Sequence, residues 1–391
     1  MKNTQQHSLW NPVFLMALAI SVVSMFSVSF VNNIVSLYVV EELNGSPAIV
    51  GEVYSLMILC AFLFRPFAGY LVDKLGRRKT LLAALILTAI LNLSLTFNLN
   101  ISLLYIIRFL SGIPFALKAI SLATLVADAL PKERMSEGIG INAVLSSVFS
   151  SIIAPILSYW MLDCYGFRFV YSAAFVMACL ALLLIVNLKY NDVRDASATF
   201  SLRSFFEPSV LWIALIFALL HMANPIIHSF VPLYALELGL SSKGLFFLFY
   251  GGGSLVSLLI NRYLARRNWP GRVSTLSILL YAAGFCVVGL IRSVPAFLAG
   301  GFLVGIGFGL SNATFNSMAM NLVEAEKRGK CNATTQIGMD LGTVLGSNAF
   351  GRVAQYYGSY QPQFSIAAVF MLLPLVLLRV FVLPHFQKHQ V

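Results

Sequence analysis

Four ionisable residues stand inside long apolar stretches of this sequence, and each could do chemistry there: Asp340, Lys118, Arg108 and His221. A charge in an apolar membrane segment is costly, so it usually marks a proton relay, an ion pair or a substrate pathway. Counted along a helix from one end of their stretches, Asp340, Lys118 and His221 fall at about 16, 18 and 18 Å. We therefore expect these three side chains to share one depth.

Proton exchange is the chemistry we expect of Asp340. A carboxyl that exchanges its proton for a lysine partner or a cationic substrate can couple proton movement to solute movement. A permanent ion pair between Asp340 and Lys118 is the alternative. Glu52, near the end of another apolar stretch, is the next candidate proton carrier. Arg108 could contact substrate or stabilise a carboxylate, or it could instead satisfy backbone carbonyls.

A second group of polar side chains has helical spacing. His221, Asn224 and His228 follow at i, i+3 and i+7, which is one face of an α-helix. Asn32 occupies the corresponding stretch of the first half of the chain. The histidine spacing also fits a metal site, but no further Cys, His or acid clusters nearby in the sequence. We favour a lining for a solute and expect no metal.

The composition indicates which elements hold these residues. Of the 391 residues, 59% are hydrophobic and 10% are charged, whereas soluble domains carry roughly 25% charged residues. A spanning helix needs about 20 apolar residues. The sequence predicts an all-α integral membrane protein with twelve such runs: 12–40, 49–72, 80–97, 101–130, 138–162, 167–188, 209–236, 245–264, 273–291, 294–323, 333–353 and 364–383.

The positive charges predict the orientation of these runs. With these twelve runs as membrane spans, nineteen of the 26 Lys and Arg fall on one side of the membrane, four on the other and three inside helices. Because cytoplasmic loops carry the excess of Lys and Arg, we expect both termini to be cytoplasmic, in a multi-pass protein of the cell membrane. The first run is too long for a signal peptide. The net charge of +11 lies in these short loops, so we expect no nucleic-acid partner.

Three motifs carry a resemblance to a known family. Residues 69–81 read GYLVDKLGRRKTL, residues 108–112 read RFLSG and residues 166–171 read GFRFVY. The halves also repeat, since VSLYVVEEL at 35–43 is similar to VPLYALEL at 231–238. In these features the chain resembles the major facilitator superfamily, in particular its drug and metabolite:proton antiporters. It departs from them where the basic segment 261–268 lacks an aspartate and where residues 150–155 keep a proline without the antiporter glycines.

The resemblance implies two pseudo-symmetric six-helix bundles, here 1–190 and 209–391, joined by a cytoplasmic linker at 191–208. It also implies a conformational latch in the 69–81 loop. Gly69 would permit close backbone approach and Gly76 a tight turn. Asp73 would bind the start of the helix that follows residue 328, whose N-terminal partial charge favours an anion. Arg77 and Arg78 would belong to this latch or would only fix the topology.

Glycines four residues apart predict close helix packing in two places, Gly338–Gly342–Gly346 and Gly301–Gly305–Gly309. The five cysteines have no CxxC spacing and are interpreted as ordinary apolar residues.

The expected function is secondary active transport by alternating access: proton-coupled efflux of a small organic molecule such as a drug, a metabolite or a metallophore-like solute. Proton symport or facilitated uptake is the alternative, and a transport-inactive sensor a further one. The sequence holds no nucleotide-binding P-loop, nucleophile triad or metal box, so we expect no enzyme activity and no cofactor, with an ion gradient, H+, as the energy source. We expect a monomer in the lipid bilayer.

Overall fold

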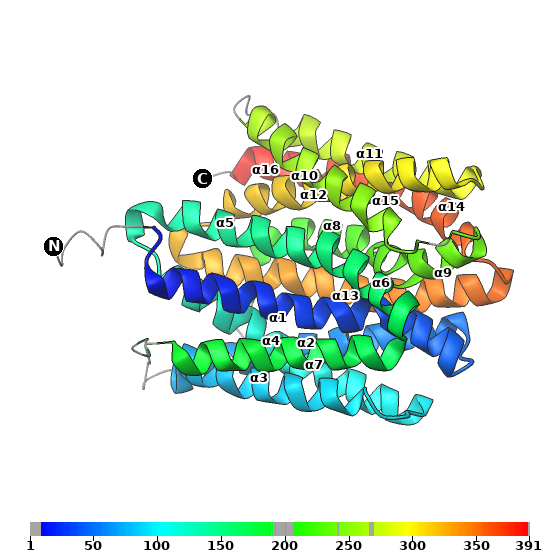
Figure 1. Ribbon diagram of the computed structural model, residues 1–391. Helices are drawn as coiled ribbons and strands as arrows, with labels where there is room; N and C mark the ends of the chain where they lie inside the picture. Colours follow the sequence, from blue (N-terminus) through cyan, green and yellow to red (C-terminus); the bar gives the residue numbers. More distant parts are fainter. Residues whose placement is uncertain are drawn as a thin grey trace. The chain divides into compact units, whose positions relative to one another are not determined.

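A computed structural model of the protein describes residues 9–188, 190, 192, 200, 206–240, 242–265 and 270–389. Within these residues all regular secondary structure is helical (Figure 1). Ten helical segments are long and apolar enough to cross a membrane. Most of the predicted linker, residues 191, 193–199 and 201–205, lies outside the described part of the chain.

The chain forms two compact units. Unit 1 comprises Met1–Ile34 and Leu56–Phe200, and unit 2 comprises Val35–Ser55 and Ser201–Val391. The chain passes from one unit to the other at residue 200, and the short segment 35–55 is grouped with unit 2. The domain boundaries expected at 190 and 209 stay predictions.

The first half of the chain supplies these helices: α1 (Pro12–Leu37), the π-helix η1 (Tyr38–Glu42), α2 (Pro47–Leu75), α3 (Arg77–Ser94), α4 (Ile101–Asp128), η2 (Lys132–Arg134), α5 (Met135–Val148), the π-helix η3 (Phe149–Ile153), α6 (Ala154–Tyr165) and α7 (Phe167–Asn187). In unit 1, α3 packs against α4 and α7. A buried core of aliphatic side chains, including Leu81, Leu85, Leu122 and Ile185, lies between α1, α3, α4 and α7.

The second half supplies the rest: η5 (Pro208–Val210), α8 (Leu211–Met222), the π-helix η6 (Ile226–Phe230), α9 (Val231–Glu237), α10 (Leu245–Ala265), α11 (Pro270–Leu290), α12 (Val294–Met320), η7 (Ala325–Lys327), α13 (Arg328–Tyr357), α14 (Gln361–Phe370), α15 (Leu372–Leu377), the π-helix η8 (Leu378–Val382) and α16 (Leu383–His389). In unit 2, α12 packs against α10 and α11, and α13 packs against α8.

The run 12–40 ends in the π-helix η1, and three other apolar runs contain π-helical turns within their length. The runs 138–162, 209–236 and 364–383 contain the π-helical turns η3, η6 and η8. Prolines lie beside two of them, Pro155 just after η3 and Pro225 at the start of η6. A proline lacks the N–H that the α-helical ladder needs, and a π-turn is a common local adjustment inside a helix.

Both glycine patterns mark close helix contacts, as predicted. A Cβ added at Gly338, Gly342 or Gly346 of α13 would overlap the backbone of α8 at Ala214, Ala218 and Met222 respectively. A Cβ at Gly305 of α12 would overlap the carbonyl of Tyr250 in α10, and one at Gly309 would overlap the side chain of Ser257. Only a residue without a side chain permits this approach.

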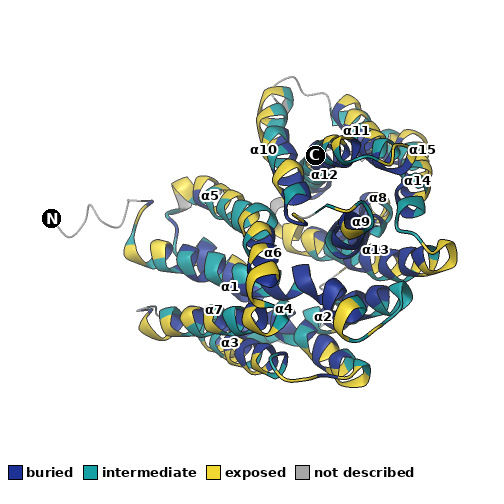
Figure 2. Cartoon of the chain, turned by 45° about the vertical axis from the view of Figure 1, so that its right-hand side comes forward, coloured by how far each residue is buried: buried dark blue, intermediate teal, exposed yellow. Residues whose placement is uncertain are grey.

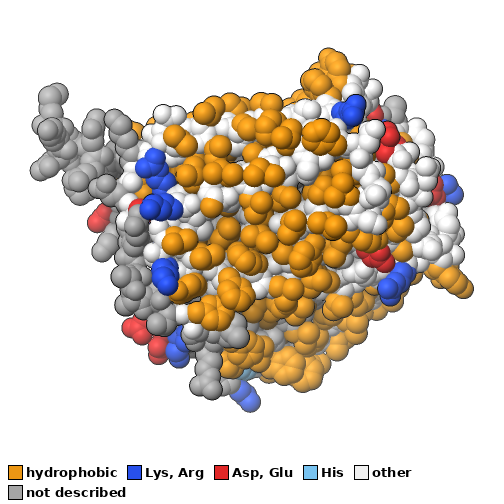
Figure 3. All heavy atoms as spheres, turned by 90° about the horizontal axis from the view of Figure 1, so that it is seen from below, with side chains coloured by type: hydrophobic (Ala, Val, Ile, Leu, Met, Phe, Trp, Pro, Cys, Tyr) orange, Lys and Arg blue, Asp and Glu red, His pale blue; other side chains and the backbone are white. Residues whose placement is uncertain are grey.

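The burial pattern suits a protein surrounded by lipid. Buried residues follow the sides on which helices of the same unit pack, and exposed residues follow the outer sides (Figure 2). Many of the exposed side chains are large and apolar, for example Leu259 and Leu290, which are 70% and 72% exposed. On the face in Figure 3, hydrophobic side chains cover the middle, while Lys and Arg gather near its margins.

Candidate functional site

Unit 1 contains a cavity that brings together three of the predicted site residues, Asn32, Arg108 and Lys118. Arg108 and Lys118 both belong to α4 and are 1% and 2% exposed. They line a cavity with about 340 Å³ of unfilled space, measured out to its mouth. Four helices supply the lining: Val28, Val31 and Asn32 from α1, Met57 from α2, Thr88, Leu91 and Asn92 from α3, and Arg108, Ser111, Pro114, Phe115 and Lys118 from α4.

Arg108 is held by a polar partner on α1. Its Nη2 donates a hydrogen bond of 2.9 Å to Oδ1 of Asn32. The next residue, Asn33, ties α1 to α6, because its Nδ2 donates to Ser158 Oγ at 3.3 Å and its carbonyl accepts from Tyr159 Oη at 2.8 Å. The two asparagines thus divide their roles. Asn32 orients the cavity arginine, and Asn33 fixes the neighbouring helix.

Asp340 lies in unit 2 and is 4% exposed. Its Oδ1 accepts a hydrogen bond of 3.2 Å from Nε2 of Gln336, one turn earlier in α13. Because Asp340 and Lys118 belong to different units, their ion pair stays a prediction.

The expected common depth of Asp340 and His221 is wrong. Gly342 of α13 lies beside Ala218 of α8, and both helices run in the same direction. Asp340 precedes Gly342 by two residues and His221 follows Ala218 by three, so His221 lies about 7.5 Å further along the helices. Depth counted from helix ends failed because α13 begins at Arg328, about 10 Å before the level at which α8 begins.

The polar residues of the seventh run do not share one α-helical face. The run turns at Ala223 and continues as the π-helix η6, so the 3.6-residue spacing does not extend from His221 to His228. Both histidines nevertheless adjoin aromatic rings. The His221 ring lies 5.4 Å from that of Phe308, and the His228 ring lies 6.4 Å from that of Tyr250.

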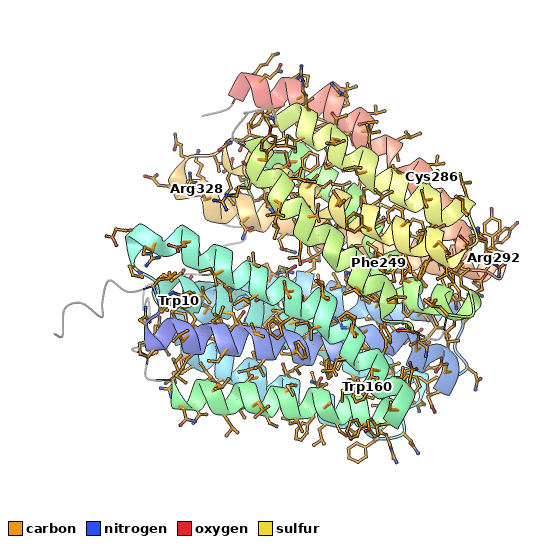
Figure 4. The ribbon with its side chains drawn as sticks, turned by 45° about the horizontal axis from the view of Figure 1, so that its top comes forward. Trp10, Trp160, Phe249, Cys286, Arg292 and Arg328 are labelled. Carbon is orange, nitrogen blue, oxygen red and sulfur yellow. The ribbon has the colours of Figure 1, made fainter. Side chains whose placement is uncertain are left out.

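Asn224, between these histidines, is half-buried. Among the residues that the structure describes, no group of three His, Cys, Asp or Glu lies close enough to hold a metal ion. Aromatic side chains surround the two histidines instead. Phe247 and Tyr250 of α10 are buried, and Phe249 of the same helix is more than a third exposed (Figure 4).

Glu52 stands near the start of α2 in unit 2 and is half-buried. Its neighbour Gly51 packs on α13, where an added Cβ would overlap the carbonyl of Ser347. Ser347 follows Asp340 by two helical turns, about 10 Å. Both candidate proton carriers therefore belong to the same unit, with Glu52 nearer the C-terminal end of α13.

The 69–81 loop makes specific contacts within unit 1. Gly76 has a φ of 96° and separates α2 from α3, which is the predicted tight turn. Arg77 Nε lies 3.0 Å from Oδ2 of Asp128 at the end of α4. The same carboxylate oxygen accepts a hydrogen bond of 2.7 Å from Tyr190 Oη. Burial, together with this hydrogen bond, raises the pKa of Tyr190, so its hydroxyl stays protonated and can donate.

Arg78 binds a different part of the unit. Its backbone N–H donates to Asp192 Oδ1 at 3.0 Å, and its guanidinium donates to the carbonyls of Ile185 and Val186 at 3.3 and 2.7 Å. These carbonyls belong to the last turn of α7, where they lack the usual α-helical donors four residues on, although the Ile185 carbonyl also accepts from the Leu188 N–H. Sequence reasoning missed Asp128, Tyr190 and Asp192, because no motif or spacing links them to the loop.

The other two residues of the proposed latch, Gly69 and Asp73, both lie in α2. Gly69 is half-buried within α2, and Asp73, near the end of the same helix, is exposed. The start of α13, with which Asp73 is expected to interact, belongs to the other unit. The latch therefore stays a prediction.

Solved structures share this fold. The nucleoside transporter NupG is 14% identical with a TM-score of 0.74, covering 97% of this chain and 100% of that one. A POT family transporter, solved in complex with a thioalcohol-conjugated peptide, is 13% identical with a TM-score of 0.83, covering 97% and 98%. At this identity the likeness concerns the fold alone.

Sequence relatives give the family. The staphylopine export protein of Staphylococcus aureus (strain Mu50 / ATCC 700699) is 22% identical over 81% of this chain and 83% of its own length. The quinolone resistance protein NorA of Staphylococcus aureus (strain MRSA252) is 22% identical over 79% and 83%. The sequence pattern described as Major Facilitator Superfamily matches residues 17–347 and 244–390. The chain therefore belongs to the Major Facilitator Superfamily of transporters.

Proposed function

We propose that this transporter exports a small organic molecule in exchange for protons. Two relatives over most of its length are named for export and for drug resistance, which favours efflux of an organic solute. The energy would come from the proton gradient, without a bound cofactor. The exported solute would belong to the drugs, metabolites or metallophores.

The observation that carries proton coupling is the buried carboxyl of Asp340. Asp340 is buried in α13, whose glycines bring its backbone into direct contact with the backbone of α8. A charge is costly in such a place unless it is compensated, so the proton occupancy of Asp340 can bias the conformation of this helix pair. Proton uptake from outside and release to the inside would then alternate with solute binding.

We further propose that the chain crosses the membrane twelve times. The two six-helix bundles would rock about a solute site between them. Ten spans pass the criteria of length and hydropathy, and α3 and α13 would be the remaining two. Both termini would face the cytoplasm, and the protein would act as a monomer. Asp73, with Gly69, Gly76, Arg77 and Arg78, would form the cytoplasmic latch to the start of α13.

Inverted membrane vesicles test the proposal. Vesicles energised to an acidic interior should release protons when an exported solute is added, which a pH-sensitive dye reports. Asp340→Asn should abolish this release because an amide cannot carry the proton. Asp163→Asn, at an exposed aspartate near the end of α6, should behave as wild type.

The outcome also decides between the candidate functions. In whole cells an uncoupler should raise the accumulated solute if the protein exports it, whereas a fall would indicate proton-driven uptake. No change in either direction would indicate a facilitator or a sensor. Proton release that persists in Asp340→Asn would show that another residue carries the proton, and Glu52 would be tested next.

A further inference from the structure

The unit 1 cavity has an unusual charge. Arg108 and Lys118 contribute two positive groups to it, and among the described residues none that lines the cavity is acidic. The other polar lining is neutral: Asn32, Thr88, Asn92 and Ser111. A guanidinium stays charged in proteins, and a buried positive charge is normally paired with an opposite one.

Lys118 is the more informative of the two cations. It is 2% exposed, and within the described part of unit 1 its ammonium has no hydrogen-bond or ion-pair partner. An ammonium group carries three donors and no acceptor. Such a group, buried and aimed into a cavity, lacks the acceptor atoms that would stabilise its charge.

The neutral polar residues around it hydrogen-bond to other partners. Thr88 and Ser111 donate to carbonyls one turn earlier in their own helices, at 2.8 and 2.7 Å. Asn92 Nδ2 donates to Ser27 Oγ at 2.9 Å and to the carbonyl of Ala174 at 3.2 Å. Asn92 thus joins α3 to α1 and α7, whereas Thr88 and Ser111 bond within their own helices. No acidic residue in the described part of unit 1 lines the cavity, so an anion bound in it would supply the missing negative charge.

The spacing of the cations limits the shape of the ligand. They are ten residues apart in α4, so their α-carbons lie about 15 Å apart along the helix axis. Both side chains lean toward the N-terminus of the helix, which preserves this separation. The empty space of about 340 Å³ includes open solvent at the mouth of the cavity, so the cavity encloses a small charged group of a ligand whose remainder can extend outward. One small carboxylate can reach one cation, and an elongated solute can approach both.

We propose that this cavity binds a carboxylate of the transported solute, with Lys118 as its counter-ion and Arg108 as the positive group at the far end. The solute would thus be a small, elongated organic acid. That the bound acid is the transported solute rests on the proposed transport function. The binding site itself rests on the cavity and its two cations. We favour a water-borne solute, and the arm with anionic lipid in the nanodiscs tests the alternative of a lipid headgroup.

Purified full-length protein in phosphatidylcholine nanodiscs provides the test. Adipate is the probe, adipamide is the uncharged match, and sodium phosphate and nanodiscs with anionic lipid are the other arms. Adipate should raise the midpoint of thermal unfolding, by an amount that grows with the logarithm of its concentration above the dissociation constant, and adipamide should not. The dissociation constant for adipate should weaken about tenfold or more in Lys118→Met, the loss expected for one charge-assisted hydrogen bond.

Lys118→Met should fold well, because it replaces an uncompensated charge with an apolar chain of similar length, and without adipate it should be at least as stable as wild type. Lys79→Met, at an exposed lysine of α3, should keep the response of wild type. Three results would overturn the proposal: an equal response to adipamide, an unchanged response in Lys118→Met, or stabilisation by phosphate or anionic lipid instead of adipate.

The binding test is independent of the transport test. An adipate response that depends on Lys118, without proton release in vesicles, would support the anion site and contradict proton-coupled export. Proton release driven by other solutes, with no adipate response, would overturn the anion site alone.

Discussion

Arg77 and Arg78 stand next to each other in the chain but bind different parts of unit 1. Arg77 pairs with Asp128 at the end of α4, and Arg78 binds the last carbonyls of α7. Together they fasten the start of α3 to two neighbouring helices. The basic cluster therefore stabilises this unit, in addition to any role in orientation or in the latch.

Asp128→Asn should lower the stability of unit 1. The ion pair is partly exposed, with side chains 15% and 30% accessible, so the expected loss is about 1 kcal/mol. Arg77→Ala should cost a similar amount, and the double variant should cost less than the sum because both changes remove the same contact. Thermal unfolding of the purified protein in detergent measures all three.

Lys79→Ala is the matched control, since Lys79 is an exposed neighbour on α3. It should change stability by no more than about 0.5 kcal/mol. Strict additivity of Arg77→Ala and Asp128→Asn would show that the pair contributes nothing in solution.

The partners of this loop could not be predicted from the sequence. Asp128 and Asp192 lie 51 and 114 residues beyond the arginines that they meet, and neither belongs to a recognisable motif. Hydropathy indicates which segments are buried but not which helices become neighbours. Gly76 was predictable, because a turn of one residue between two helices requires the backbone freedom of glycine.

At the scale of elements, Gly338, Gly342 and Gly346 of α13 pack so closely against α8 that no side chain fits at these positions. Gly342→Ala places a methyl group against the carbonyl of Ala218. Separating the helices to admit it should cost about 1–3 kcal/mol, as overpacking does in other proteins. The variant should unfold at a lower temperature in detergent, and it should lose transport because α13 carries Asp340.

Gly329→Ala, in the first turn of the same helix, is the internal control. A Cβ at Gly329 meets nothing within 4 Å. Alanine favours a helix over glycine by up to about 1 kcal/mol, so this variant should be as stable as wild type or slightly more so. A destabilised Gly329→Ala, or a wild-type Gly342→Ala, would contradict the packing explanation.

Helices were easier to predict than their interruptions and relative depths. Each long apolar run coincides with helix, since a segment in lipid must satisfy its own backbone hydrogen bonds. The turn at Ala223 and the π-helix η6 leave hydropathy unchanged, so the sequence did not predict them, and the predicted shared helical face of His221 and His228 was therefore wrong. Depth also depends on where polar ends project, as the early start of α13 shows.

At the scale of the whole molecule, charge asymmetry remains the main argument for orientation. Arg292 and Arg328 lie at opposite ends of the helices of unit 2 (Figure 4). The first is one of only four Lys and Arg on its side in the predicted topology, while the second belongs to the side with nineteen. The positive-inside rule then assigns Arg328 to the cytoplasm and Arg292 to the exterior.

Native and introduced cysteines can test this orientation. All five cysteines lie in the described part of the chain, and Cys164, at the end of α6, is the exposed one. A membrane-impermeant maleimide should label Cys164 in right-side-out membranes, and Cys164→Ser should remove that label. Glu326→Cys, added to Cys164→Ser at an exposed position before α13, should react only in inverted vesicles. The reverse pattern would place the termini outside, and with them the basic loops, against the electrostatic preference that predicts this topology.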